Sequence, residues 1–437
     1  MISNRFLTTT VAGFLAVEAN AAGPRFDELS VPLGPSAWGV ARCISSDGRI
    51  TGGGFSQGAN GGSRENAGPM FWTNNDPGQF VTTYSPGSRA EIRALTPDGR
   101  LGVGVTEFDP VANVSGPVVW DLVLGQARGL AKTVSWSSDA ACAVNQDGTI
   151  IVGRNAGRAV VWVGNNQPVQ LISAPYAAAS AVSADGSTIV GSFGPEDVSG
   201  SSAFVWTASS GAVQIPSPLQ GASHTRALAL TPDGAIAVGY SGNENGSGAM
   251  VRWTLGAGGA VLSTDGLSPS GYCFFSSLVH TGDDYPIAVS ASGDVVGGTV
   301  DGRAILWTEG SGLLDLAAIY EELVPPPAID PEDPTESRPL PHAVTGVSAD
   351  GREVVGVLYR FDGRYSVPAS WKLTLPPRCD ADANFNGVAD TQDLVRLLGA
   401  FGLTVPFGTR GDSNGDGFVD NSDLVRLLAG FGSPCPQ

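Results

Sequence analysis

Seven copies of a short turn sequence constrain the fold of this chain more than any other feature. They are SSDG at Ser45, TPDG at Thr96, NQDG at Asn145, SADG at Ser183, TPDG at Thr231, SASG at Ser290 and SADG at Ser348. A short apolar run follows each turn, and a variable stretch then leads to a Trp. The seven Trp residues are Trp72, Trp120, Trp162, Trp206, Trp253, Trp307 and Trp371. Self-similarity at such a period indicates a repeat architecture, in which each unit stacks on its neighbours.

Each repeat is predicted to form four short strands. Asp-Gly between two apolar runs is a strong hairpin signal, because Gly accepts a positive φ and Asp bonds its own backbone. A third strand carries the Trp, as in SAFVWTA, and a fourth follows a small turn, as in AVQIPS. Four strands make one propeller blade. The sequence therefore predicts a mainly β chain, with a seven-bladed β-propeller over residues 23–375.

The N-terminal segment is predicted to complete the last blade of this ring. The seventh repeat ends at PASWKLTLPP without a clear fourth strand, whereas residues 25–33 (RFDELSVPL) have the pattern of one. Closure of this kind leaves no free sheet edge and removes a template for aggregation.

A twelve-residue pattern occurs twice near the C-terminus, as DANFNGVADTQD (382–393) and DSNGDGFVDNSD (412–423). Oxygen-bearing side chains at positions 1, 3, 5, 9 and 12, with Gly at position 6, form the layout of an EF-hand-type calcium loop. The predicted ligands of two calcium ions are Asp382, Asn384, Asn386, Val388, Asp390 and Asp393, then Asp412, Asn414, Asp416, Phe418, Asp420 and Asp423. Val388 and Phe418 would use their backbone carbonyls. The second loop has Asp416 where the first has Asn386, so we expect it to bind calcium more tightly.

The duplicated loops, each followed by one helix and ending in Asp at position 12, resemble the type I dockerin, a bacterial calcium-dependent docking module. The resemblance covers about Cys379 to Cys435, and residues 376–437 are assigned to this small α-helical domain. It implies a cohesin-like or other surface protein as partner. Alternatively, calcium only stabilises the tail and nothing docks. The leucines at spacings of three and four are predicted to form the core of the module: Leu394, Leu397, Leu398, Leu424, Leu427 and Leu428.

The repeat unit resembles the HAF family of bacterial extracellular repeats. AFVWTASSGAVQIP and AILWTEGSGLLDL are the closest matches, and the resemblance covers about Trp38 to Leu375. The biochemical role of that family is poorly defined, so the resemblance implies a fold rather than a function.

Composition and the N-terminus indicate where the protein works. A net charge of −18 leaves no basic surface for nucleic acid. Residues 1–22 have the pattern of a secretory signal peptide, with Arg5, an apolar stretch and Ala19-Asn20-Ala21 as cleavage site. No later stretch is long and apolar enough to span a bilayer. We expect an extracellular or cell-surface protein, in which a disulfide between Cys379 and Cys435 is plausible. The pairing of Cys43, Cys142 and Cys273 stays open.

The sequence holds little sign of catalysis. Its three His residues (His224, His280 and His342) show no metal-ligand or triad-like pattern, and no other catalytic motif is present. The first hypothesis is a non-catalytic propeller that binds a protein or a glycan. The alternatives are a glycoside hydrolase or polysaccharide lyase, and a purely structural surface protein. We assign the seven repeated Trp residues to the core, which leaves Trp38 and Trp136 as candidates for an exposed aromatic contact.

Overall fold

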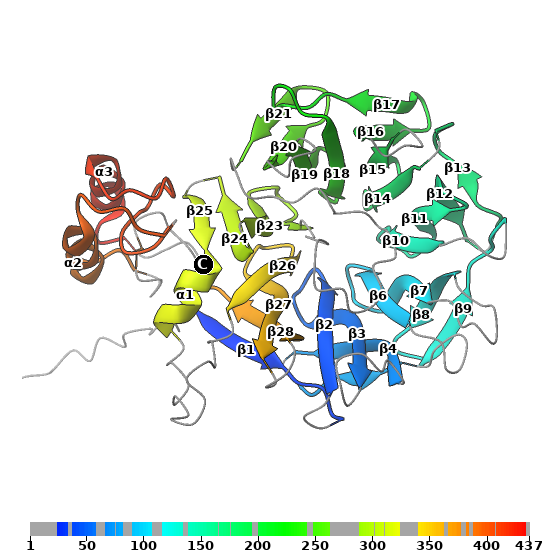
Figure 1. Cartoon of the computed structure of the whole chain (residues 1–437), viewed down its shortest axis with the longest axis horizontal. Helices are drawn as coiled ribbons and strands as arrows, with labels where there is room; N and C mark the ends of the chain where they lie inside the picture. Colours follow the sequence, from blue (N-terminus) through cyan, green and yellow to red (C-terminus); the bar gives the residue numbers. More distant parts are fainter. Residues whose placement is uncertain are drawn as a thin grey trace, which may run out of the picture.

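The computed structural model describes residues 24–33, 37–57, 66–74, 76–81, 90–106, 116–133, 139–164, 166–174, 176–194, 200–242, 248–262, 288–300, 302–309, 311–323, 340–361, 366–376, 382–383, 388–406 and 408–433. These residues form seven four-stranded antiparallel sheets around a central axis, and three helices (Figure 1). The predicted mainly β, seven-bladed propeller is confirmed. The predicted signal peptide lies outside the described residues.

The blades follow one another along the chain, and each runs from the axis outwards. The first strands are β2 (Ala37–Ile44), β6 (Ala90–Leu95), β10 (Ala140–Val144), β14 (Ala178–Val182), β18 (His224–Leu230), β22 (Ala288–Val289) and β26 (Pro341–Val347). The second strands are β3 (Ile50–Gln57), β7 (Leu101–Thr106), β11 (Ile150–Asn155), β15 (Thr188–Phe193), β19 (Ile236–Gly242), β23 (Val295–Val300) and β27 (Glu353–Phe361). The third strands are β4 (Asn66–Thr73), β8 (Gly116–Asp121), β12 (Arg158–Val163), β16 (Ser202–Thr207), β20 (Gly248–Thr254), β24 (Arg303–Thr308) and β28 (Ser366–Thr374). The fourth strands are β5 (Gln79–Phe80), β9 (Gln126–Gly129), β13 (Val169–Gln170), β17 (Gly211–Ile215), β21 (Gly258–Val261), β25 (Gly312–Asp315) and β1 (Arg25–Leu29).

The Asp-Gly turns form because their side chains bond locally. In blade four, the Ser183 hydroxyl donates to Asp185 Oδ1 at 2.6 Å, and the Ser187 backbone amide donates to the same oxygen at 2.9 Å. These hydrogen bonds lower the pKa of Asp185 to about 2. Gly186 takes a φ of 76°, in the left-handed region that a side chain disfavours. The side chain of the turn aspartate therefore stabilises the hairpin turn.

Neighbouring turns are also bonded to one another around the ring. The bonds run from Ser46 N to Pro97 O, Gln146 N to Ala184 O, Ala184 N to Pro232 O, Ala291 N to Ala349 O and Ala349 N to Ser46 O, at 2.7–3.1 Å. Proline has no amide hydrogen, so Pro97 and Pro232 accept a hydrogen bond from one neighbouring turn but cannot donate one to the next turn. The last of these bonds joins blade seven to blade one.

The repeated Trp residues are confirmed as core. Trp72, Trp120, Trp162, Trp253 and Trp371 are fully buried, while Trp206 and Trp307 are partly buried against apolar clusters. Three of them donate from the indole to a carbonyl just after the outer strand of the preceding blade, at 2.7–2.9 Å: Trp72 to Ser30, Trp162 to Ala131 and Trp253 to Pro216. Each such Trp joins two blades.

The interpretation of Trp38 as an exposed contact was wrong. Its ring is buried and packs with Val40 and Val357, where blades one and seven meet near the axis. The other candidate, Trp136, lies outside the described residues.

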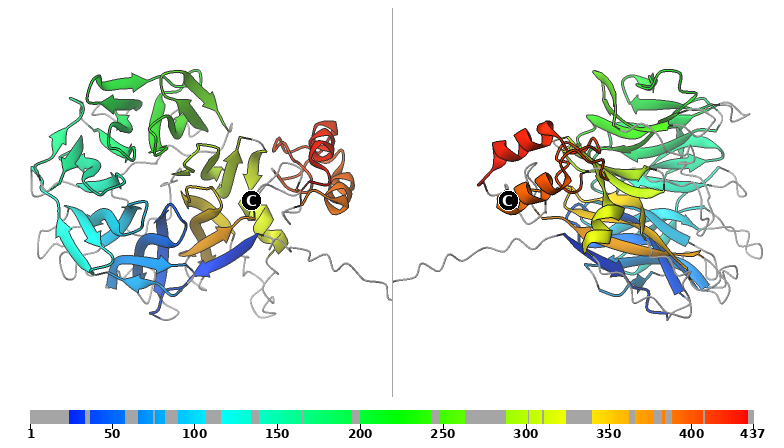
Figure 2. Two further views of the ribbon diagram at one scale, coloured as in Figure 1. Left: turned by 180° about the vertical axis from the view of Figure 1, so that it is seen from behind. Right: turned by 60° about the vertical axis from the view of Figure 1, so that its left-hand side comes forward.

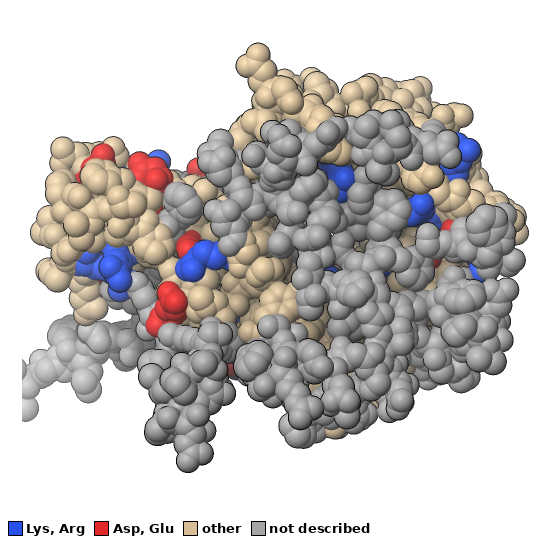
Figure 3. Space-filling view, in the orientation of Figure 1, with Lys and Arg blue, Asp and Glu red and all other residues tan. Residues whose placement is uncertain are grey.

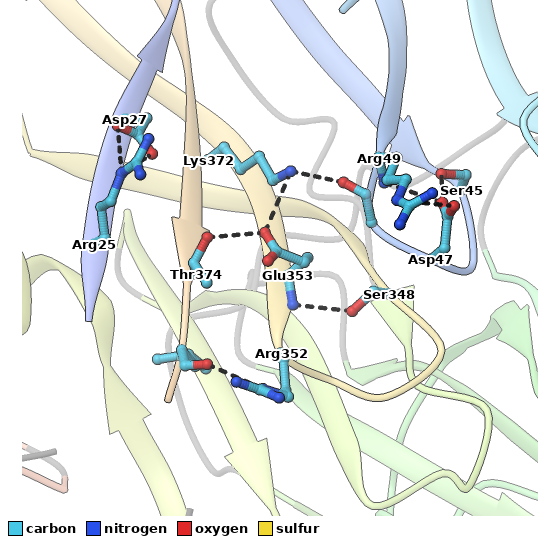
Figure 4. Close-up of polar contacts among 12 residues, drawn as sticks. Arg25, Asp27, Ser45, Asp47, Arg49, Ser348, Arg352, Glu353, Lys372 and Thr374 are labelled. Carbon is cyan, nitrogen blue, oxygen red and sulfur yellow. Dashed lines mark hydrogen bonds and ion pairs between the residues drawn. The ribbon is translucent and has the colours of Figure 1, made fainter. Parts of the chain in front are cut away.

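The ring closes where the N-terminal strand meets the seventh blade. Strand β1 pairs antiparallel with β28, from Arg25 opposite Thr374 to Leu29 opposite Ser370. Between blades seven and one, the buried Lys372 ammonium donates to the Gly48 carbonyl at 2.6 Å and lies 3.3 Å from a carboxylate oxygen of Glu353 (Figure 4). Closure therefore uses both a strand pair and a charged contact.

The C-terminal residues form a small module at the rim of the ring. It contains α2 (Thr391–Ala400) and α3 (Asn421–Gly430), and lies next to β25 and the short helix α1 (Leu316–Leu323) in both views (Figures 1 and 2). Its core comprises Leu397, Ala400, Val405, Val419 and Leu427, with Leu394 and Leu424 packed against it. No helix in the described ranges is long and apolar enough to cross a membrane.

The prediction that all six leucines of the module are core was wrong for two of them. Leu398 and Leu428 are 54% and 55% exposed. The two positions are equivalent in the duplicated helices, so both helices turn an apolar side chain to the outside.

Candidate metal centre

The two predicted calcium loops are held to each other by reciprocal backbone bonds. Gly402, just after α2, donates to the carbonyl of Val419 at position 8 of the second loop, at 2.8 Å. Gly432, just after α3, donates to the carbonyl of Ala389 at position 8 of the first loop, also at 2.8 Å. Ala389 and Val419 are fully buried. The pair of loops is therefore one unit with approximate internal symmetry.

Position 1 of the second loop is a buried carboxylate. Asp412 is only 2% exposed, and its Oδ2 accepts from the amides of Gly408 and Gly417, each at 2.9 Å. Its Oδ1 accepts from the amide of Asp416 at 3.1 Å. Gly417 occupies position 6 with a φ of 83°, so the chain can turn back towards Asp412.

Position 12 closes the second loop and starts the following helix. Asp423 is fully buried, and its Oδ1 accepts from the amides of Ser413 and Asn414 at 2.8 and 3.1 Å. Its Oδ2 accepts from the amide of Asp420 at 2.8 Å, and Asp420 in turn caps α3. This reciprocal capping box explains why the helix begins directly at the loop.

In the middle of the second loop, side-chain oxygens accept hydrogen bonds from backbone amides two residues further on. Asn414 Oδ1 accepts from the Asp416 amide at 2.9 Å, and Asp416 Oδ1 accepts from the Phe418 amide at 2.9 Å. The side chain of Phe418 at position 7 is exposed, as is that of Val388 in the first loop. Since Val and Phe side chains have no oxygen, only the backbone carbonyls of these two residues could serve as ligands.

Part of the first loop repeats this arrangement. Asp382 and Asp393 are buried, Asp390 caps α2, and the Asp390 amide donates to Asp393 Oδ2 at 2.8 Å. Two predicted ligands, Asn384 and Asn386, lie outside the described residues.

The surroundings of Asp412 in the second loop disfavour its charged form. Burial raises the pKa of Asp412, the amides of Gly408 and Gly417 oppose the rise, and the negative charges of Asp423 and Asp416 add to it. In the described part of the chain, no group of three or more His, Cys, Asp or Glu side chains is gathered closely enough to hold a metal by itself. The loop offers a mixed set of carboxylate, amide and backbone oxygens, which is the donor chemistry that calcium prefers. The residues of the second loop therefore fit a calcium ion.

The cysteines divide into two described and three undescribed residues. Cys142 on β10 is disulfide-bonded, whereas Cys43 on β2 is a free thiol whose pKa burial raises to about 12. Cys273, Cys379 and Cys435 lie outside the described residues, so the bond between Cys379 and Cys435 stays a prediction.

Sequence reasoning missed two polar clusters on the first strands of the ring. Glu91 on β6 is buried and lies 2.8 Å from Arg93 and 3.4 Å from Arg42 of the neighbouring blade. Near blades four and five, the Ser201 hydroxyl lies 3.5 Å from Nδ1 of His224 and accepts from Arg226 at 3.2 Å.

Comparison of equivalent positions in the seven repeats could have revealed both clusters. Position for position, Glu91 and Arg226 stand where other blades have small apolar residues, such as Ala140 and Ala178. A charged side chain at a position that is otherwise apolar requires a partner, because burying an unpaired charge is costly.

No family model matches the chain, and no curated protein matches it. Among solved structures, the chain is similar to TolB from Acinetobacter baumannii at 15% identity and a TM-score of 0.36, covering 77% of this chain and 63% of TolB. It is also similar to an oligogalacturonate lyase in complex with manganese at 12% identity and a TM-score of 0.47, covering 81% and 97%. The β-propeller domain of the Trilobed protease from Pyrococcus furiosus gives 12% identity and a TM-score of 0.44, covering 77% and 93%. The strand order of the seven sheets, rather than these distant likenesses, establishes the propeller.

Proposed function

We propose that this chain is an exported, non-catalytic binding protein. Its ring recognises a protein or a glycan at one face, and its C-terminal module holds two calcium ions and attaches the chain to a partner protein. The observation that carries the proposal is Asp412, a buried carboxylate with the negative charges of Asp416 and Asp423 close by. A divalent cation relieves this repulsion, which backbone amides alone do not neutralise.

Attachment through the module is supported by the outer faces of its helices. Val395 and Leu398 on α2 are well exposed, and so are Val425 and Leu428 at the equivalent positions of α3. Residues three apart on a helix are neighbours, so each pair forms a small apolar patch, and exposed apolar patches can mark sites of protein–protein interaction. On the face shown in Figure 3, most of the visible acidic side chains lie on the module and the neighbouring part of the ring, where Lys and Arg side chains are also visible. The partner that fits is a folded protein domain with an apolar surface, such as a cohesin-like domain.

A calcium titration of the full chain tests the first half of the proposal. Isothermal titration calorimetry should detect two sites in the wild type. Asp412→Asn should weaken one of them strongly, since it removes a buried ligand charge. Asp185→Asn is the matched control, because Asp185 is confined to a hairpin turn of the ring. Failure of the wild-type chain to bind calcium would exclude the proposal.

A cohesin-like domain, with and without EDTA, tests the second half. Binding should require calcium and should be lost in the double variant Leu398→Asp with Leu428→Asp. The control is Val213→Asp, which changes an equally exposed apolar residue of the ring. Calcium binding without any binding of the partner by the wild type would leave a tail that is only stabilised by its metal, and a double variant that still binds the partner would exclude Leu398 and Leu428 as the docking surface.

A further inference from the structure

The outermost strand of blade six is covered, whereas the equivalent strand of blade four faces solvent. Gly312 begins β25 five residues after Trp307, and Gly211 begins β17 five residues after Trp206. Leu314 of β25 is 0% exposed, but Val213 at the equivalent position of β17 is 49% exposed. Leu314 packs in an apolar cluster with Leu306, Leu316 and Ile319. In addition, a Cβ added to Gly312 would meet a further neighbour, whereas one added to Gly211 would meet nothing within 4 Å.

That neighbour is the C-terminal module, and the approach is backbone against backbone. A Cβ added to Gly408 would lie 2.6 Å from Cδ1 of Leu314 and 2.8 Å from the carbonyl oxygen of Leu313. A Cβ added to Gly415 would meet backbone atoms of Ser311 and Leu313, and one added to Gly312 would meet the carbonyl of Asn414. Glycine is needed on both sides because any side chain would separate the surfaces.

The residues of the module in this contact belong to the second calcium loop or its immediate approach. Asn414 is the predicted ligand at position 3, Gly415 is position 4, and the Gly408 amide donates to the buried carboxylate of Asp412. The backbone that a bound cation would hold in place is thus the backbone that fits against β25. A loop that loses its cation gains freedom at these positions and loses the fit.

We infer that calcium binding in the second loop is coupled to docking of the module on the outer strand of blade six. The inference rests on the proposed calcium binding, and it adds that the ring is itself a ligand of the module. Calcium strengthens docking, and docking raises the calcium affinity of the second loop by the same factor, because such coupling is reciprocal. Strand β25 is accordingly an edge that calcium keeps covered.

Two substitutions in the full chain separate docking from backbone strain. Gly312 and Gly211 have nearly the same positive φ, 67° and 64°, but nothing lies within 4 Å of a Cβ added to Gly211. Gly312→Ala should weaken one of the two calcium sites by about fivefold or more, the lower end of typical coupling between sites. Gly211→Ala should leave both sites unchanged. Hydrogen exchange should show that calcium protects residues 312–315 in the wild type and in Gly211→Ala, but not in Gly312→Ala.

A second pair approaches the same contact from the module. Gly408→Ala obstructs the approach to Leu314 from outside the twelve-residue loop, whereas Gly402→Ala has a similar positive φ and open space around it. Gly408→Ala should reproduce the weakening by Gly312→Ala, and Gly402→Ala should not. If both calcium sites kept their wild-type affinities in all four variants, the coupling would be excluded, whereas calcium binding itself would still hold. A wild-type chain that binds no calcium would overturn both.

Discussion

The ring and the C-terminal module reach an ordered state by different means. Each blade buries apolar side chains against its neighbours, and the N-terminal strand completes the seventh sheet, so the ring is closed through its own packing. Among the described residues of the module, the apolar core cluster contains five buried residues and lies next to buried acidic side chains. A domain of this size usually needs a metal or a disulfide to fold. Under the proposed function, we therefore expect the module to depend on calcium for its fold and the ring not to.

The chain itself provides separate signals for the two parts. All nine Trp residues precede residue 376, so Trp fluorescence reports on the ring alone. Helices α2 and α3 belong to the module, and their amide exchange can be followed residue by residue. The predictions below use these signals to challenge the comparison.

Removal of calcium should have the largest effect, and most of it should fall on the module. At a calcium concentration 1,000 times the dissociation constant, each site contributes about 4 kcal/mol to folding. In EDTA, we expect α2 and α3 to lose their protection against hydrogen exchange, while the melting temperature followed by Trp fluorescence falls only slightly because the ring loses the docked module. Equal destabilisation of ring and module would contradict this difference between the two parts.

Deletion of residues 24–29 should damage the ring and leave the module able to bind calcium. Leu29 is buried at the closure of the ring, and loss of a buried Leu side chain alone costs about 2–5 kcal/mol. The deletion also leaves β28 as an open edge, so we expect aggregation or a much lower melting temperature. Arg25→Ala is the control, since it removes only an exposed ion pair, which contributes about 0–1 kcal/mol. Unchanged melting of the deletion variant would contradict the role of β1 in closure.

Loss of the Glu91 carboxylate should destabilise the ring by about 3–5 kcal/mol, because it removes the buried negative charge that faces Arg42 and Arg93. Urea denaturation of Glu91→Ala followed by Trp fluorescence measures this. Burial alone would raise the pKa of Glu91, but the two arginines outweigh it and hold the pKa below its usual 4.5. The charged form therefore stabilises the ring above pH 4.5, and this contribution is lost as the pH falls through the lowered pKa. The stability difference between wild type and Glu91→Gln should shrink on acidification; a constant difference would exclude this ion pair as its cause.

The smallest expected effect distinguishes the two loops within the module. Asp416→Asn gives the second loop the side-chain charge of the first, so its calcium affinity should fall by about tenfold, or about 1.4 kcal/mol. Asn386→Asp should strengthen the first loop in the same sense. Calorimetry on the full chain measures both, and Trp-monitored stability should not change in either variant. A first site that is already tighter in the wild type would contradict the ranking by charge.

The sequence predicted the features that depend on local chemistry. The Asp-Gly turns form through bonds within four or five residues, as between Ser183 and Asp185, and repetition makes their geometry readable. The repeated Trp residues could be assigned to the core because seven equivalent positions share one environment. Trp38 could not, since its burial depends on Val357, which belongs to the last blade and reaches it only when the ring closes.

Other features depended on which surfaces meet. Leu398 and Leu428 follow the spacing of a core face, but the core of the module uses Leu397 and Leu427 and leaves these two outside. The partners of Glu91 come from its own strand and from the blade before it, so the cluster exists only after two repeats have stacked.

Taken alone, the amino-acid order determined the number of blades, the hairpin turns and the positions of both loops, because each rests on contacts between near neighbours in the chain. Only the tertiary structure decided that the second loop lies against β25, since Gly312 and Gly415 are a hundred residues apart and nothing local relates them. In the sequence, the close approach of two backbones shows only as glycine. A chain with 60 glycines therefore does not reveal which of them make such a contact.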